Sequence, residues 1–191
     1  MQIQNKYYYF KSALSSEQCQ KIIDIGVNKI TTEATIHGIN HNVRDSEVSW
    51  FDDSWLYDLL HPYLQIANDK AGWRYELDLS EKIQFTKYNK GGFYDWHADG
   101  NSCHFGKYNK YNTNNPNFIN KIRKLSMTVN LNKPEDYDGG NLQFDSVPEV
   151  EEIRAQGSII IFPSYIYHQV TPVTRGTRYS LVMWALGEPF K

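Results

Sequence analysis

The N-terminal third of the chain carries hydrophobic residues at helical spacing. Between residues 14 and 30 the apolar side chains fall on one helical face, at Leu14, Cys19, Ile22, Ile23 and Ile30. Ser15 and Gln18 have the spacing of a capping box, in which each side chain binds the other residue's backbone N–H. The pattern therefore predicts a helix that starts just after Ser15.

A second helix is predicted to begin at Asp53 and to end at Gly72. Its apolar face is formed by Trp55, Leu56, Leu59, Leu60, Tyr63 and Ile66. Pro62 lies inside this pattern and is expected to kink or split the helix, because proline lacks an N–H and clashes with the preceding turn. We expect both helices to support a sheet.

From residue 73 onward the pattern changes to short strands separated by turn residues. The candidate strands are 73–79, 82–88, 93–99, 124–131, 141–144, 149–155, 158–162, 167–173 and 177–186. Such a run favours a small two-sheet barrel, so we expect an α+β, mainly β fold. With 191 residues the chain is expected to form a single domain, with helical support over about 12–72 and the barrel over about 73–190.

Residues 100–120 interrupt the strand pattern. They are rich in Asn, Lys and Tyr and do not alternate between apolar and polar positions. Loops of this length are often lids or disordered segments, and Gly91, Gly92 and Gly100 around the preceding strand would permit a lid to move. Ordinary turn chemistry explains the glycines equally well.

Composition narrows the compartment and the partners. Fourteen tyrosines and five tryptophans suit β structure, and a formal charge of -2 gives no strong field for nucleic acid or a membrane surface. Cys19 and Cys103 lie in different contexts, which argues against a disulfide framework. The first residues lack the features of a secretion signal, and no apolar run reaches membrane-spanning length. We therefore expect a cytoplasmic protein with no membrane partner.

One pair of residues suggests metal chemistry. His97 and Asp99 are two positions apart on a predicted strand, so their side chains point to the same side. This pair alone could arise by chance, but His168 near the other end of the barrel pattern supplies a third ligand. Two histidines and one carboxylate form the facial triad that leaves positions open on non-haem Fe(II).

The last predicted strand carries a basic residue on a face expected to line the barrel. Arg178, Ser180, Val182 and Trp184 share that face if the strand is regular. A buried guanidinium needs an anionic partner. A ligand carboxylate would serve, and so would an internal acid such as Asp95 or Asp145, and the sequence leaves both open.

The segments 83–99, 123–144 and 157–190, and more faintly 43–60, resemble the 2-oxoglutarate and Fe(II)-dependent dioxygenases, specifically the prolyl 4-hydroxylase-like group that includes the PKHD-type hydroxylases. The resemblance implies a double-stranded β-helix, a jelly-roll or cupin-like barrel. It also implies hydroxylation that uses Fe(II) and O2, coupled to decarboxylation of 2-oxoglutarate to succinate, with ascorbate as a reductant.

The resemblance assigns roles to individual residues. His97, Asp99 and His168 match the iron ligands, while Arg178 and Tyr88 match the residues that hold the far carboxylate of 2-oxoglutarate. Ser180 is a further expected cosubstrate contact, from strand alternation. The expected peptide-groove residues, for which ordinary barrel packing is an equal alternative, are Tyr94, Arg123 and Trp184. The chain departs from the prolyl 4-hydroxylases at Leu142, where they carry a threonine, and at Leu186, where some carry a histidine.

The expected substrate is a peptidyl residue of a protein, with proline first, because Tyr94 and Trp184 offer flat apolar faces for its ring. An oxygenase acting on free amino acids or other small molecules is an alternative. Nucleic-acid oxidation is another, because basic and aromatic residues alternate at Lys107, Tyr108, Lys110, Tyr111, Phe118, Lys121, Arg123 and Lys124. The remaining alternative is a non-catalytic barrel that acts as a binding module.

Overall fold

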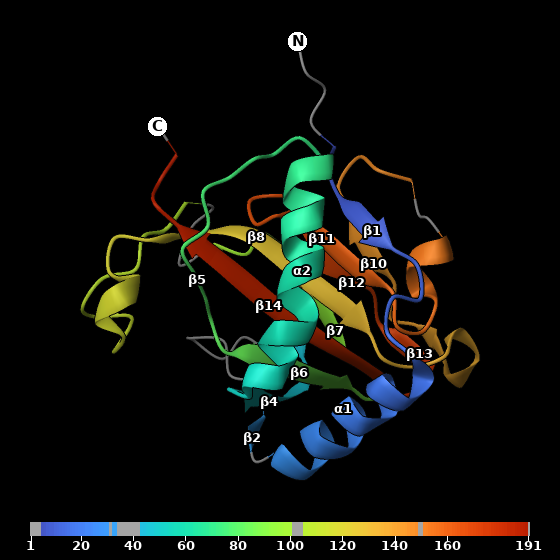
Figure 1. The fold of residues 1–191 in the computed structure, drawn as a ribbon. Coiled ribbons are helices and arrows are strands. Elements are labelled where there is room, and N and C mark those ends of the chain that lie inside the picture. Colours follow the sequence, from blue (N-terminus) through green and yellow to red (C-terminus); the bar gives the residue numbers. More distant parts are fainter. Residues whose placement is uncertain (1–4, 31, 34–42, 101–104, 149–150, 191) are drawn as a thin grey trace.

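The computed structural model describes residues 5–30, 32–33, 43–100, 105–148 and 151–190. Its β-strands form two facing sheets and a short ribbon (Figure 1). Two helices and three short 3-10 helices complete the described elements. The predicted α+β, mainly β architecture is therefore confirmed.

The large sheet contains eight antiparallel strands. Seven follow the order β1 (Tyr8–Phe10), β11 (Ile159–Pro163), β8 (Ile122–Asn130), β14 (Arg178–Gly187), β6 (Ile83–Tyr88), β4 (Glu47–Phe51) and β2 (Thr32–Glu33), and β5 (Leu79–Ser80) pairs with β14. The smaller sheet has the order β10 (Leu142–Phe144), β12 (His168–Val170), β7 (Phe93–His97) and β3 (Arg44–Asp45). The ribbon joins β9 (Tyr137–Gly139) to β13 (Val173–Gly176).

The two helices, α1 (Ser16–Lys29) and α2 (Ser54–Lys70), pack on the same face of the large sheet (Figure 1). The predicted capping box of α1 is present: the Gln18 N–H donates to Ser15 Oγ over 3.2 Å, and the Ser15 N–H donates to Gln18 Oε1 over 2.8 Å. Asp53 is the N-cap residue of α2 and Gly72 follows its end. Pro62 does not split α2, which continues through it as one helix.

Alternation along β8 and β14 divides the large sheet into an apolar face and a polar face. Leu125, Met127 and Val129 of β8 belong to the core beneath the helices, as do Leu181 and Met183 of β14. The intervening residues, including Ser126, Thr128, Asn130, Arg178 and Ser180, point to the opposite side, where the smaller sheet lies. The sheet is therefore supported by the helices on one side and presents polar groups to the barrel interior on the other.

The predicted strand at 73–79 is wrong except at its last residue, since only Leu79–Ser80 pair as a strand. Tyr75 instead makes its backbone hydrogen bonds with a side chain of α2: its N–H donates to Asn68 Oδ1 over 3.0 Å, and its carbonyl accepts from Asn68 Nδ2 over 2.9 Å. Arg74 has φ +52°, which no strand accommodates. A helix side chain thus replaces a neighbouring strand here.

The predicted strand at 149–155 is also wrong over its described part, which forms the 3-10 helix η3 (Glu151–Arg154). The other two 3-10 helices are η1 (Pro116–Phe118) and η2 (Pro134–Asp136). The short strands β1, β2, β3, β4, β9 and most of β13 were not predicted, and β2, β3 and β4 lie inside the region expected to be helical support. Short edge elements depend on their neighbours in the sheet more than on local periodicity.

The described residues bear in part on two expectations, the absence of a membrane-spanning segment and the absence of a disulfide framework. Among the described helices, none is both long enough and apolar enough to cross a membrane. Cys19 is buried and has a free thiol, whereas Cys103 lies outside the described residues.

The contact between α1 and β6 predicts an unusual effect of a helix substitution. An added Cβ at Gly26 would lie 2.5 Å from the buried ring of Phe85, and the Gly26 carbonyl accepts from Ser49 Oγ over 2.9 Å, so the helix cannot easily retreat. Gly26→Ala should lower the free energy of unfolding by about 1–3 kcal/mol through overpacking, measured by urea denaturation. Helix propensity alone would predict the opposite, because alanine is more favourable than glycine in a helix interior by roughly 1 kcal/mol.

The cause of this loss can be separated from a general effect on the helix. In a Phe85→Leu background the same Gly26→Ala change should cost less, because the shorter side chain can yield. A stabilising effect of Gly26→Ala in the parent protein would contradict the predicted clash.

Candidate active site

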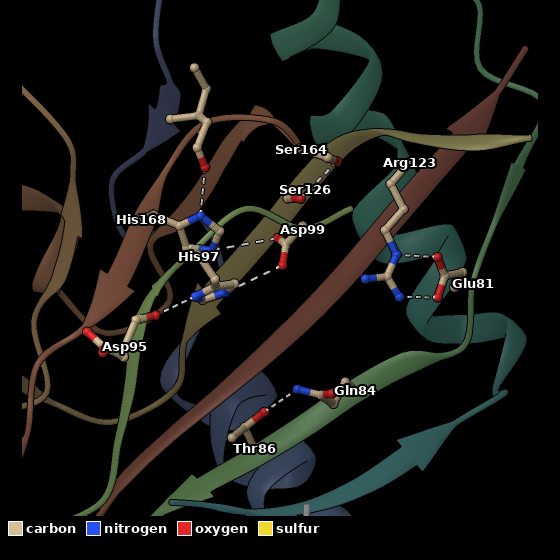
Figure 2. Close-up of polar contacts among 11 residues, drawn as sticks. Glu81, Gln84, Thr86, Asp95, His97, Asp99, Arg123, Ser126, Ser164 and His168 are labelled. Carbon is tan, nitrogen blue, oxygen red and sulfur yellow. Dashed lines mark hydrogen bonds and ion pairs between the residues drawn. The ribbon is translucent and has the colours of Figure 1, made fainter. Parts of the chain in front are cut away.

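The three residues predicted to bind a metal come together at one end of the smaller sheet. His168 lies directly opposite His97 in the pairing of β12 with β7, and Asp99 follows β7 by two residues. His97 Nε2 is 3.6 Å from Asp99 Oδ1, and His168 Nε2 is 3.7 Å from Asp99 Oδ2 (Figure 2). Ligand atoms lie about 2.0–2.2 Å from a transition-metal ion, so atoms at this spacing can bind the same ion.

Backbone carbonyls orient both imidazole rings. His97 Nδ1 lies 2.7 Å from the Asp95 carbonyl, and His168 Nδ1 lies 2.9 Å from the Ile166 carbonyl (Figure 2). With the proton on Nδ1, each ring donates to its carbonyl and directs the Nε2 lone pair toward Asp99. This is the arrangement that metal-binding histidines need.

Electrostatics favour the charge states of a ligand set. Burial lowers the pKa of His168 to about 4, which keeps the ring neutral with its lone pair available. Burial alone would raise the pKa of Asp99, but His168, His97 and Arg123 outweigh it and lower that pKa, so the carboxylate is ionised. An anionic carboxylate oxygen beside two imidazole nitrogens is a donor set that fits Fe(II).

Arg178 is buried in the large sheet without a carboxylate partner. It is 2% exposed, and its Nη2 donates to Asn130 Oδ1 over 2.9 Å while Nη1 donates to Ser180 Oγ over 3.2 Å. Its Nε is buried and has no hydrogen-bond partner. Within the described residues it forms no ion pair, so the internal partners considered from the sequence, Asp95 and Asp145, do not neutralise it. A buried guanidinium with a free donor fits an anionic ligand.

A cavity of about 790 Å³ connects these groups. It is lined by all nine of the candidate site residues: Tyr88, Tyr94, His97, Asp99, Arg123, His168, Arg178, Ser180 and Trp184. Leu142 also lines it, whereas Leu186 is fully buried and does not. The face of β14 on which Arg178, Ser180, Val182 and Trp184 were predicted to lie together is thus the one that faces the cavity.

The expected peptide-groove residues lie on two walls of this cavity. On the large sheet, the Arg123 guanidinium lies 3.9 Å from the centre of the Trp184 ring and donates to both oxygens of Glu81 over 2.6 and 2.7 Å (Figure 2). On the smaller sheet, the Tyr94 ring stacks on His97 with centroids 3.5 Å apart. Arg123 is therefore held in place and already neutralised by Glu81.

The segment 105–121 borders the same cavity. The Tyr108 hydroxyl donates to Glu81 Oε1 over 2.7 Å, and the segment contributes Asn112, Thr113 and Phe118 to the lining. Glu81 thus joins this segment to Arg123. That the segment 105–121 acts as a lid stays a prediction. Residues 101–104 of the expected loop lie outside the described residues.

The basic residues of this region are largely engaged within the chain. Lys121 pairs with Asp78 over 2.6 Å and with Glu188 over 2.5 Å. Arg123 pairs with Glu81, and Lys124 is buried 3.8 Å above the Phe190 ring. These contacts leave few free cations for a phosphate backbone, which weakens the nucleic-acid alternative.

The cavity lining also includes residues to which the sequence assigned no role in the site, among them Arg44, Trp50, Glu81 and Gln84. Arg44 and Trp50 come from β3 and β4, the short strands missed in the N-terminal third. The brief alternation from Glu47 to Trp50 is a weak signal for a strand there.

A two-sheet barrel that gathers two histidines and a carboxylate near a buried arginine defines the architecture of a non-haem iron oxygenase. The profile of the 2OG-Fe(II) oxygenase superfamily matches residues 83–186, which is more than half of the chain. The chain belongs to this superfamily.

Its curated relatives are PKHD-type hydroxylases. The one from Prochlorococcus marinus is 34% identical over 103 residues, which cover 53% of this chain and 40% of that protein. The PKHD-type hydroxylase PiuC of Pseudomonas aeruginosa is 32% identical over 104 residues, covering 52% and 41%. The chain thus spans about two fifths of the length of these relatives.

Solved prolyl hydroxylases share the fold. The viral collagen prolyl hydroxylase of Paramecium bursaria Chlorella virus-1, solved with 2OG, aligns with a TM-score of 0.69 and 19% identity over 96% of this chain and 97% of that one. The Trichoplax adhaerens prolyl hydroxylase, solved with a hypoxia inducible factor peptide, aligns with a TM-score of 0.71 and 16% identity over 95% and 83%. The predicted double-stranded β-helix is confirmed.

The Glu81 network predicts a stability cost that a surface pair would not show. Glu81→Gln leaves the Arg123 guanidinium enclosed without its counter-charge and weakens the bond from Tyr108. The free energy of unfolding should fall by about 3 kcal/mol, measured by urea denaturation. Hydrogen exchange should also rise in residues 105–121. The control Asp138→Asn breaks the exposed pair with Arg175 and should leave both measurements nearly unchanged.

Proposed function

We propose that this protein is an Fe(II)- and 2-oxoglutarate-dependent hydroxylase that acts on a prolyl residue of a peptide or protein. Membership of the oxygenase superfamily supports the chemistry. The observation that carries the proposal is the convergence of His97, Asp99 and His168 in a cavity that also holds the unneutralised Arg178.

In this proposal His97, Asp99 and His168 hold the iron. Bound iron together with 2-oxoglutarate supplies oxygen activation coupled to decarboxylation to succinate. The chain's own contribution is to fix the orientation of both imidazoles through the Asp95 and Ile166 carbonyls, and to lower the pKa of His168 by burial. No acid or base side chain is required.

Arg178 holds the far carboxylate of 2-oxoglutarate in this proposal, with Tyr88 and Ser180 beside it. The guanidinium lies 5.4 Å from the centre of the Tyr88 ring and within a hydrogen bond of Ser180. Leu142 can offer the cosubstrate only an apolar contact, so Arg178 bears more of the binding. Ascorbate is expected to sustain turnover as a reductant.

A prolyl substrate is supported by the walls around the metal. Tyr94 and Trp184 present aromatic surfaces on opposite sheets, and Arg123 lies against Trp184. Pyrrolidine rings pack well on such faces. The similar chains named above as prolyl hydroxylases point to the same class, one of them crystallised with a peptide.

A peptide panel tests this function. Proline-containing peptides and free amino acids are incubated with Fe(II), ascorbate and 2-oxoglutarate, and a 16 Da gain is measured by mass spectrometry alongside succinate. Peptides should gain oxygen in step with succinate, and His97→Ala should abolish both products. The matched control is His61→Ala, because His61 lies on α2 and binds Ser80, away from the cavity. Reaction of free amino acids alone would refute the peptidyl substrate.

Cosubstrate binding gives a second prediction. Arg178→Gln should raise the Kd of 2-oxoglutarate by about 10- to 100-fold, because the lost hydrogen bonds to charge are worth about 1.5–3 kcal/mol. Titration calorimetry of the Mn(II)-loaded protein under nitrogen measures this. For 2-oxobutanoate, which lacks the far carboxylate, parent and variant should bind with similar Kd. An equal loss for both ligands would place Arg178 elsewhere in the site.

A further inference from the structure

We propose that Arg44 recognises a carboxylate of the substrate, so that the preferred substrate is a peptide with an acidic side chain near the modified proline. This inference rests on the proposed function, which it deepens by adding a charge requirement. It concerns a residue on β3, which pairs with β7 and brings Arg44 opposite Tyr94.

Arg44 lines the cavity close to the metal ligands. Its guanidinium lies 4.8 Å from the centre of the Tyr94 ring, and that ring in turn stacks on His97. The Tyr94 ring therefore lies between the Arg44 guanidinium and His97, so a group bound by Arg44 would lie in the same part of the cavity as the metal ligands. This placement suits a side chain adjacent to the one that reacts.

The guanidinium has unused hydrogen-bonding capacity. Its Nε donates to Ser46 Oγ over 2.8 Å, but its Nη2 is buried and has no hydrogen-bond partner. Among the described residues no acidic side chain forms an ion pair with it. A buried donor left unpaired is unfavourable, so its free energy improves when a ligand supplies an acceptor.

The other two arginines of the cavity have acidic partners once iron and 2-oxoglutarate are bound. Arg123 is neutralised by Glu81. Arg178 faces the dianionic cosubstrate, and together with the ferrous ion and the Asp99 carboxylate these charges cancel. Arg44 is then the cavity cation without a counter-charge in the described chain, and a planar fork of donors selects a carboxylate.

The experiment compares peptides that differ only in charge. Each peptide holds one proline and, at one position within three residues of it, Glu, Gln or Lys. Turnover is measured by mass gain, and binding by calorimetry to protein loaded with Mn(II) and 2-oxoglutarate under nitrogen. The variants are Arg44→Gln, Arg44→Lys and the control Arg175→Gln, which removes an exposed cation that pairs with Asp138.

The parent protein should prefer the Glu peptide over its Gln counterpart at one position by about 10- to 100-fold in kcat/KM. Arg44→Gln should remove that preference while the Gln peptide keeps its parent rate within about threefold. Arg44→Lys should retain only part of it, and Arg175→Gln should retain all of it. The Kd of 2-oxoglutarate should not change.

Other results decide against the inference. An equal loss for all peptides in Arg44→Gln would mean that Arg44 only supports Tyr94, and equal rates for Glu and Gln peptides in the parent would mean binding of a neutral carbonyl. If no peptide is turned over, the proposed function fails. The calorimetric measurements then still test whether Arg44 binds the carboxylate of the peptide. Tighter binding of the Glu peptide that depends on Arg44 supports the inference, and its absence overturns it.

Discussion

The antiparallel pairing of β7 with β12 is the constraint on which the site depends. It sets His168 opposite His97 and lets Asp99, two residues beyond, close the triangle of ligand atoms. Side chains on a strand alternate between faces, so a shift of one residue in this register would turn one imidazole away from the cavity. The carbonyls that orient the two rings belong to the same strands or the turns beside them, so the ligand geometry follows from the backbone.

The large sheet holds the charged side chain of Arg178 inside the barrel. Its strands send alternate side chains into the helix-covered core, and this apolar face stabilises strands whose other face is polar. Asn130 of the neighbouring strand β8 and Ser180 of β14 itself then accept hydrogen bonds from the Arg178 guanidinium. The cavity can therefore keep an arginine that is solvated by the protein and still available to a ligand.

The sequence allowed prediction of those parts that depend on periodicity or on a recognisable ligand spacing. The capping box at Ser15 and the shared face of β14 follow from local spacing, whereas the meeting of His97 with His168 was expected because the residues match a facial triad. The stretch from Trp73 to Asp78 was mispredicted because the backbone of Tyr75 pairs with the Asn68 side chain rather than with a strand, and periodicity does not encode such a contact. Arg44 was missed because it lies on a strand of two residues, β3, which forms only by pairing with β7.

Glu81 accepts hydrogen bonds from both Arg123 and Tyr108, so one carboxylate contacts both the large-sheet wall of the cavity and the segment 105–121. Two events that draw on the same group are thermodynamically linked. Any ligand that displaces Arg123 alters the free energy of holding the segment in place, and ordering of the segment alters the affinity for that ligand by the same factor. The free energy of ligand binding at Arg123 and the free energy of holding the segment 105–121 in place are in this respect coupled.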